Sequence, residues 1–265
     1  MKIKFACAAA ALAVAFASNV AFADDAPAPT PDFTVTGSAA IVSQYRFRGI
    51  SQSDNKVTGQ ASITLSHKSG FYVAAWASGA SAGNSTVNIG GSEIDVYGGY
   101  THAIGKTGLT FDGGLYGYLY PGNDLNEYYE LYGSLTKAYG PITAKAGLNW
   151  APKQSYFTYW NTATKYNMYE YFELGLAVPK TAFTVHAHVG HTGGGFNYVK
   201  EYLDYTAGVS YKWKNLTLDL SAVGTNIGKS DAFKAPLTDQ TGTPNPDQTF
   251  RAAKSVAVLS LTASF

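Results

Sequence analysis

Hydrophobic and polar side chains alternate along most of the chain after residue 32. The alternation is clearest in residues 254–265 (KSVAVLSLTASF), where odd-numbered positions are mostly apolar and even-numbered positions are mixed to polar. A period of two is typical of a β-strand with one face against an apolar environment. The pattern therefore predicts an all-β protein.

The same alternation marks further strand-like segments, each bounded by Gly, Pro, Ser or Asn residues. The predicted strands are 33–48, 57–67, 71–78, 92–102, 108–120, 127–139, 142–150, 166–178, 182–191, 201–213, 215–226 and 254–265. Most are close to the roughly 9–11 residues that a tilted strand needs to cross a bilayer. Their number, about 12, is even, as in bacterial outer-membrane barrels.

The connections between these segments alternate strictly between short and long. The short ones are 68–70, the stretch around 105–106, 140–141, 179–181 and 214, and the long ones are 49–56, 79–91, 121–126, 151–165, 192–200 and 227–253. This rhythm predicts a transmembrane antiparallel up-and-down β-barrel with short periplasmic turns and longer extracellular loops. A soluble up-and-down barrel is the alternative, but its outward polar face would be rich in Lys and Glu, whereas Gly, Ser, Thr, Tyr and Asn dominate here.

The N-terminus has the pattern of a secretory signal peptide over residues 1–23. Lys2 and Lys4 precede an apolar run, and Ala21-Phe22-Ala23 forms a small-x-small cleavage signature. Residues 24–32 are a Pro- and Ala-rich linker, and residues 33–265 are the expected outer-membrane barrel. The single Cys of the chain, Cys7, lies within the signal peptide, so we expect no thiol or disulfide after cleavage.

Composition supports this assignment. The chain has 20 Tyr, 14 Phe and 28 Gly residues, which suit aromatic-rich strands joined by tight turns. Basic and acidic residues nearly balance, with 19 Lys and Arg against 18 Asp and Glu, so nucleic acid is not an expected partner. After residue 23 no apolar run approaches the length of a transmembrane helix.

Two runs carry a family resemblance. The segments SQYRFRGISQSD (43–54) and SHKSGFYVAAWAS (66–78) resemble the TorF family of porins, also catalogued as Gcw_chp-type bacterial outer-membrane proteins. The final Phe265 resembles the C-terminal aromatic residue that the barrel-assembly machinery of Gram-negative bacteria reads as an assembly signal. The resemblance implies a location in the cell outer membrane and a barrel fold, and it transfers no catalytic residues.

No motif points to an enzyme, and no cofactor is expected. Some barrels of this size are outer-leaflet enzymes, which leaves that class as a third hypothesis. His186 and His188 lie on one face of a predicted strand and could share a transition metal. We favour two neutral, water-bonded histidines in the lumen, and therefore predict no metal site.

Charged residues suggest a pore lining. By parity, Gln44, Arg46 and Arg48 of the first strand and Lys254 of the last face the lumen on one wall. Asp95, Glu130, Glu173 and Asp204 are predicted on the opposite wall. Opposed charges would create a transverse field. Alternatively, these residues form ordinary solvated lining and salt bridges that hold loops.

These features predict a narrow passive channel for small hydrophilic solutes, because twelve strands should leave a constricted lumen. Inward Tyr116, Tyr118, Tyr132 and Tyr171 would narrow it further. Its expected partners are outer-membrane lipid, the assembly machinery and the solutes. The main alternative is a non-conducting structural or adhesive barrel whose lumen is plugged by the loop 227–253. The identity of the solute and the oligomeric state are left open.

Overall fold

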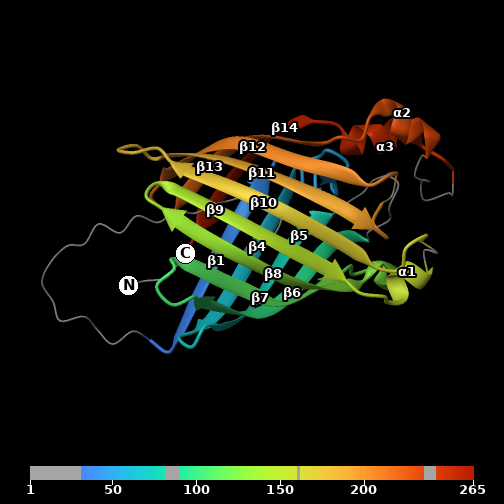
Figure 1. Ribbon diagram of the computed structural model, residues 1–265. Helices are drawn as coiled ribbons and strands as arrows, with labels where there is room; N and C mark the ends of the chain where they lie inside the picture. Colours follow the sequence, from blue (N-terminus) through green and yellow to red (C-terminus); the bar gives the residue numbers. More distant parts are fainter. Residues whose placement is uncertain (1–30, 81–89, 160–161, 198, 236–242) are drawn as a thin grey trace, which may run out of the picture.

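A computed structural model describes residues 31–80, 90–159, 162–197, 199–235 and 243–265. Twelve antiparallel strands form a closed barrel, so the predicted fold and strand number are confirmed (Figure 1). Each strand pairs with its neighbours in the chain, and β14 pairs with β1 to close the barrel. The barrel strands are β1 (Phe33–Val42), β4 (Thr58–His67), β5 (Phe71–Ala80), β6 (Gly91–Ala103), β7 (Leu109–Leu119), β8 (Tyr128–Tyr139), β9 (Ile142–Ala151), β10 (Asn167–Ala177), β11 (Phe183–Gly194), β12 (Tyr202–Trp213), β13 (Leu216–Thr225) and β14 (Val256–Ser264).

The alternation of the sequence decides which side chains face outward. In β14, Leu259 and Leu261 are exposed on the outer surface, while Ser260 and Thr262 face the lumen. The same rule holds around the barrel, so its outer surface is a belt of Leu, Val, Ile and Phe side chains. A one-residue shift of any strand would reverse its two faces, which is why the apolar belt fixes the register.

The two ends of the barrel differ, as predicted. The short turns and both ends of the described chain lie at one end (the turn end), and the long connections lie at the other (the loop end; Figure 1). At the Gly140-Pro141 turn the chain reverses within two residues, and Gly140 has a φ of +56°. The loop end carries η1 (Asp124–Asn126), α1 (Ser155–Tyr159), α2 (Lys229–Lys234) and α3 (Pro246–Ala253). None of the helices in the described ranges is long and apolar enough to cross a membrane.

The last residue is part of the barrel seam. The backbone of Phe265 exchanges two hydrogen bonds with Gly37 of β1, both of 3.0 Å. Its ring lies over Gly37, where a Cβ atom would approach the ring to within 2.5–2.9 Å. An aromatic ring that covers a glycine on a neighbouring strand is a known way to stabilise a sheet.

Aromatic side chains occupy two different places. Phe71, Tyr139, Phe183 and Trp213 are exposed around the turn end, as an interfacial girdle requires. A second set fills the interior toward the loop end. It consists of Tyr45, Trp76, Tyr97, Tyr116, Tyr118, Tyr120, Tyr128, Tyr156, Phe157 and Phe196, with Phe47, Tyr72 and Tyr132 packed against them.

Candidate functional site

The candidate site is the lumen, and its main feature is the first loop, residues 43–57. The predicted first strand, 33–48, is too long, because β1 ends at Val42. Beyond Val42 the chain turns inward and forms a hairpin of β2 (Arg46–Phe47) and β3 (Ile50–Ser51). Gln44, Arg46 and Arg48 therefore lie on this inward hairpin and not on the barrel wall.

The tip of the hairpin requires an unusual backbone. Arg48 has a φ of +47° and Gly49 a φ of +78°. A Cβ atom on Gly49 would lie 2.7 Å from the carbonyl oxygen of Gly224, at the loop end of β13. Glycine at position 49 therefore allows both the turn and the close approach to the backbone of β13.

Aromatic contacts bind the hairpin to the wall. Tyr45 packs on Trp76 of β5, with ring centroids 5.2 Å apart, and its hydroxyl donates to Glu93 of β6 at 3.1 Å. Phe47 packs edge-on against Tyr118 of β7 at 5.6 Å. Sequence alternation alone would make Tyr45 and Phe47 interfacial residues, but they are interior because the chain leaves the wall at residue 43.

Arg48 crosses the lumen to Glu130 of β8. Its Nη2 atom lies 2.6 Å and 2.8 Å from the two carboxylate oxygens, and the side chains of Arg48 and Glu130 are only 4% and 0% exposed. The guanidinium also lies over the ring of Tyr169, 4.1 Å from its centroid. Burial alone would lower the pKa of Arg48, but the charge of Glu130 and its hydrogen bond, together with the neighbouring Tyr118 and Tyr128, outweigh burial and hold that pKa well above its usual value.

Arg46 points to the loop end, where it binds carbonyl groups. Its Nη1 atom donates to the carbonyl oxygens of Gly49 (2.6 Å), Ala252 (3.0 Å) and Lys254 (3.0 Å). Ala252 lies in the last turn of α3 and Lys254 is its C-cap, and a cation at the C-terminal end of a helix is favoured by the helix dipole. Burial lowers the pKa of Arg46 to about 10, so the group stays charged at neutral pH.

Lys254 does not line the lumen. It caps the C-terminus of α3, its side chain is exposed, and β14 begins only at Val256. In the described part of the loop 227–253, α3 packs beside the first loop, with Ala253 near Ile50 and Tyr202. It is therefore the loop 43–57 that enters the lumen, whereas the described residues of the loop 227–253 pack beside it at the loop end.

The histidines belong to a chain of buried pairs. His186 Nε2 lies 2.6 Å from Asp219 of β13. His188 lies between two carboxylates, 3.1 Å from Asp204 and 3.5 Å from Glu173. Both histidines face inward, as the parity of β11 predicts. Both contact carboxylates rather than only water, in contrast to the interpretation from sequence.

Four further inward residues belong to the same lining, and their parity could have shown it: Glu93, Asp112, Lys145 and Asp219. Asp112 accepts a hydrogen bond from Tyr72 at 2.7 Å, and Lys145 lies over the ring of Tyr171, 5.4 Å from its centroid. Asp95 accepts a hydrogen bond from Tyr116 at 3.0 Å. Tyr116, Tyr118, Tyr132 and Tyr171 all point inward, as predicted.

The predicted separation of charges onto opposite walls is wrong. Arg48 touches Glu130 directly, and Lys254 is outside the lumen. Instead, the lumen has a network wall and a neutral wall. The network wall, the inward side of β5–β13, holds the inward tyrosines and all the inward titratable groups of the barrel strands. The neutral wall, the inward side of β14, β1 and β4, holds small uncharged side chains, among them Ser38, Ala40, Ser62, Val258 and Ser260.

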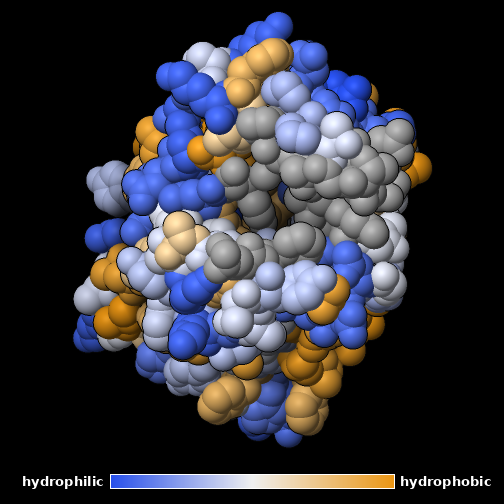
Figure 2. Space-filling view, turned by 90° about the vertical axis from the view of Figure 1, so that its right-hand side faces the viewer, coloured by the Kyte–Doolittle hydropathy of each residue, from blue (hydrophilic) through white to orange (hydrophobic). Residues whose placement is uncertain are grey.

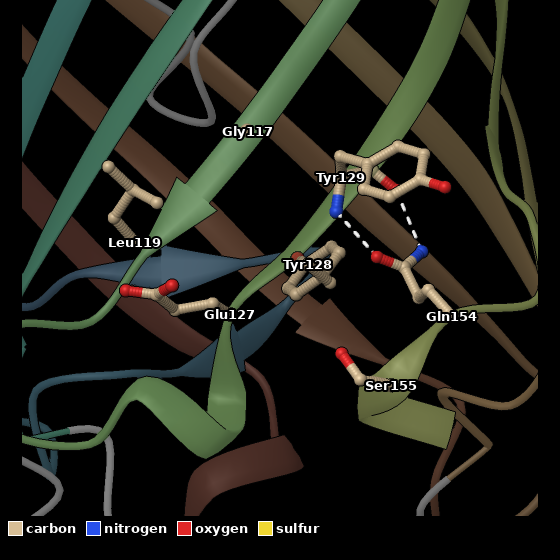
Figure 3. Close-up of a pocket in the computed structure, with 7 residues that line it drawn as sticks. All are labelled: Gly117, Leu119, Glu127, Tyr128, Tyr129, Gln154 and Ser155. Carbon is tan, nitrogen blue, oxygen red and sulfur yellow. Dashed lines mark hydrogen bonds between the residues drawn. The ribbon is translucent and has the colours of Figure 1, made fainter. Parts of the chain in front are cut away.

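One surface pocket lies outside the lumen. It measures about 240 Å³ and is lined at the loop end of β7 and β8 by residues that include Leu119, Glu127 and Ser155. Figure 3 shows the side chain of Gln154 bonded to both the backbone N–H and the carbonyl of Tyr129, at 2.8 Å and 3.0 Å. The side chain of Gln154 thus takes the place of a pairing strand at the loop end of β8. We attribute the pocket to this irregular edge of the sheet. Among the described residues, no group of three or more His, Cys, Asp or Glu side chains is placed to hold a metal ion.

Comparison with known proteins agrees with this architecture. Residues 26–264 match the family described as "Bacterial protein of unknown function (Gcw_chp)". The chain belongs to the Gcw_chp family. No curated protein matches this Gcw_chp chain.

Two solved porins are similar to it in fold. The first is the KdgM porin in complex with disordered oligogalacturonate, with a TM-score of 0.53 and 10% identity over 88% of this chain and 99% of that chain. The second is the NanC porin, with a TM-score of 0.53 and 9% identity over the same shares, 88% and 99%. At such low identity the similarity concerns the barrel fold alone.

Proposed function

We propose that this Gcw_chp protein is a non-enzymatic outer-membrane channel through which small hydrophilic solutes diffuse passively. The observation that carries the proposal is the contrast between the two faces of the barrel. Leu, Val, Ile and Phe side chains cover the outside, whereas Ser, Thr, Tyr and charged side chains line the inside. An apolar belt outside and a polar lumen inside are typical of outer-membrane barrels.

The same reasoning gives an orientation. We place the turn end, with both termini, in the periplasm and the long loops outside the cell, as short turns and long loops are arranged in such barrels. Phe265 at the seam would serve the barrel-assembly machinery, and the belt would contact outer-membrane lipid. The signal peptide 1–23 and nearly all of the linker 24–32 lie outside the described residues, and remain predictions. We also propose that the chain is a TorF-type porin, since the segment 43–54, one of the two that carry that resemblance, includes the inward hairpin.

The route of the solute would follow the neutral wall. The first loop lies against β5 to β8 and reaches β10 and β13, so the network wall is filled toward the loop end. The side chains of Ser38, Ala40 and Ser260 are much smaller than the tyrosines opposite, and all three remain partly exposed. Figure 2 looks onto the loop end.

A planar-bilayer experiment tests the proposal. Purified, refolded protein should produce stepwise conductance increases, small compared with those of sixteen-stranded porins because the lumen is narrower. The double variant Arg48→Ala, Glu130→Ala removes the buried ion pair as a unit, and should increase the size of each step by loosening the hairpin. A protein that inserts as a folded barrel and gives no steps in either form would contradict the proposal.

A non-conducting structural or adhesive barrel is the second candidate. It is favoured by one observation, the hairpin anchored across the lumen by Arg48 and Glu130. In that case the wild-type protein would not conduct, and only the double variant would.

A further inference from the structure

We propose that the lumen passes cations and uncharged solutes in preference to anions. This proposal names the solute class of the channel and therefore rests on the proposed function. Its basis is the number, sign and pairing of the charges that the described residues place inside the barrel.

Carboxylates outnumber cationic groups in the lumen. The strands direct seven of them inward: Glu93, Asp95, Asp112, Glu130, Glu173, Asp204 and Asp219. The permanent cations are Lys145 and Lys212 from the strands and Arg46 and Arg48 from the first loop. Glu93 and Asp95 are hydrogen-bonded to each other and share one proton, so six negative charges face the four permanent cations, and the described lumen stays net negative with one of the two histidines charged.

The arginines are already engaged within the protein. Arg48 is closed off by Glu130, and Arg46 by the carbonyl groups around the C-terminus of α3. The Nη1 atom of Arg48 has no hydrogen-bond partner among the described residues, but it is buried. An anion would therefore have to displace Glu130 or the carbonyl groups to bind a whole guanidinium group, and displacement of Glu130 would leave an unpaired buried carboxylate.

At least one inward carboxylate, in contrast, has an oxygen atom that accepts no hydrogen bond from the described residues. Asp204 is 3% exposed, and its Oδ1 atom accepts hydrogen bonds from Tyr169 and from His188. Its Oδ2 atom is buried and accepts no hydrogen bond from the described residues. A buried carboxylate oxygen with free lone pairs favours a cation or a hydrogen-bond donor as its neighbour.

The magnitude follows from the geometry of a narrow pore. Low-dielectric walls focus the field of fixed charges on the solution between them. One net negative charge about 10 Å from an ion in a water-like dielectric changes the local concentration of that ion about twofold, upward for a cation and downward for an anion. The expected permeability ratio of a monovalent cation to chloride is therefore about fourfold or higher at low salt.

This expectation separates the protein from the KdgM porin, whose structure was solved with oligogalacturonate, a polyanion. The two barrels share a fold, but the lumen described here offers a polyanion no row of free cations. Acidic oligosaccharides should therefore fail to block the current, whereas neutral oligosaccharides of equal length should be able to enter.

Reversal potentials across a bilayer in a potassium chloride gradient test the proposal. With the wild-type protein we expect the sign that reports potassium preference, and a reversal potential of the chloride sign would overturn the inference while leaving the channel function intact. Absence of any conductance would overturn both. Block of the current by oligogalacturonate at concentrations where a neutral oligosaccharide has no effect would also overturn it.

A matched pair of variants assigns the effect to the lumen. Asp112→Asn removes one inward charge near the turn end and keeps the side-chain shape, and should lower the permeability ratio by up to about fourfold. Glu170→Gln makes the same chemical change on the outer face of β10, where Glu170 is exposed and bonded to His191. It should leave the ratio unchanged. If both variants lower the ratio equally, the selectivity does not arise in the lumen.

Discussion

The two walls of the lumen are made by strands of the same barrel, yet they differ in almost every physical property. The network wall carries large aromatic rings and charged groups, many of them buried and joined by hydrogen bonds from different strands. The neutral wall carries uncharged side chains, most of them small. Its side chain–side chain hydrogen bonds include one between Ser38 and Ser62 at 2.8 Å and one from Gln60 to Ser78 of β5 at 3.4 Å.

On the proposed function, the difference would allow one barrel to be rigid and still leave a path for a solute. On the network wall, side chains and the first loop fill the interior as a protein core does, so that wall resists deformation. On the neutral wall the side chains are too short to reach that packing. Space for a solute along the proposed route would therefore result from the asymmetry of the lining and not from the number of strands alone.

The largest expected effect comes from breaking the network wall at its most buried charge pair. Glu130→Ala leaves Arg48 buried without its partner, and should lower the free energy of unfolding by about 3–5 kcal/mol. Urea unfolding in detergent micelles measures the loss. The control on the neutral wall is Ser260→Ala, whose cost should stay within about 0.5 kcal/mol. Equal losses in the two variants would show that the walls do not differ in packing.

A second experiment places a large side chain on the neutral wall. Ala40→Trp places a large ring inside the barrel where the path is proposed, and should reduce single-channel conductance by roughly half or more, since a lumen of this size is narrow. Ala39→Trp adds the same ring to the outer face of the same strand, where residue 39 is exposed. It should leave conductance unaltered. Unchanged conductance in Ala40→Trp would place the path elsewhere.

Much of this architecture could be predicted from the sequence, because the alternation of apolar and polar residues in each strand indicates which of its side chains face outward. The period of two, repeated twelve times and separated by short and long connections, was enough for the fold, the strand number and the inward position of residues such as His188 and Glu173. The same parity would also have identified Glu93, Asp112 and Asp219 had it been applied to every strand.

The first loop was assigned wrongly because its residues alternate like those of a strand. Gln44, Arg46 and Arg48 alternate with Tyr45 and Phe47, so the pattern of β1 continues after its backbone has left the wall. What distinguishes the segment is tertiary: the contact of Arg48 with Glu130, 82 residues away in the chain, cannot be inferred from local periodicity.

The error at Lys254 was avoidable. Asn245-Pro246-Asp247 is typical of a helix start. The side chain of Asn245 is the N-cap and accepts a hydrogen bond from the backbone N–H of Gln248, and Pro246 and the acidic Asp247 lie in the first turn, at the positive end of the helix dipole. That signal places residues 246–253 in a helix and moves the start of the last strand beyond Lys254.

A smaller effect is expected on the outer side of the neutral wall. Gly37→Val collides with the ring of Phe265, and should destabilise the seam by about 1–3 kcal/mol and lower the amount of assembled barrel. Gly59→Val is the matched control, because a Cβ atom at the outward Gly59 of the neighbouring strand has no heavy atom closer than 4.0 Å. The folded fraction in isolated outer membranes measures both. Deletion of Phe265 should resemble Gly37→Val, and normal membrane levels after deletion would contradict its role as an assembly signal.

The smallest expected effect tests whether water contacts the side chains of the neutral wall. Ser38→Ala removes the hydroxyl that is bonded to Ser62 on the adjacent strand. If solvent fills the space beside this wall, water replaces the lost partner, and the free energy of unfolding should change by less than about 0.5 kcal/mol, because one hydrogen bond is exchanged for another. If the wall is dry, the Ser62 hydroxyl loses its partner in a buried site, at a cost of about 1–3 kcal/mol. Tyr116→Phe is the reference on the network wall, where the hydroxyl of Tyr116 bonds to buried Asp95 and its loss should cost about 1–3 kcal/mol. A cost for Ser38→Ala as large as that for Tyr116→Phe would mean that both walls are packed, and the proposed route along the neutral wall would then be wrong.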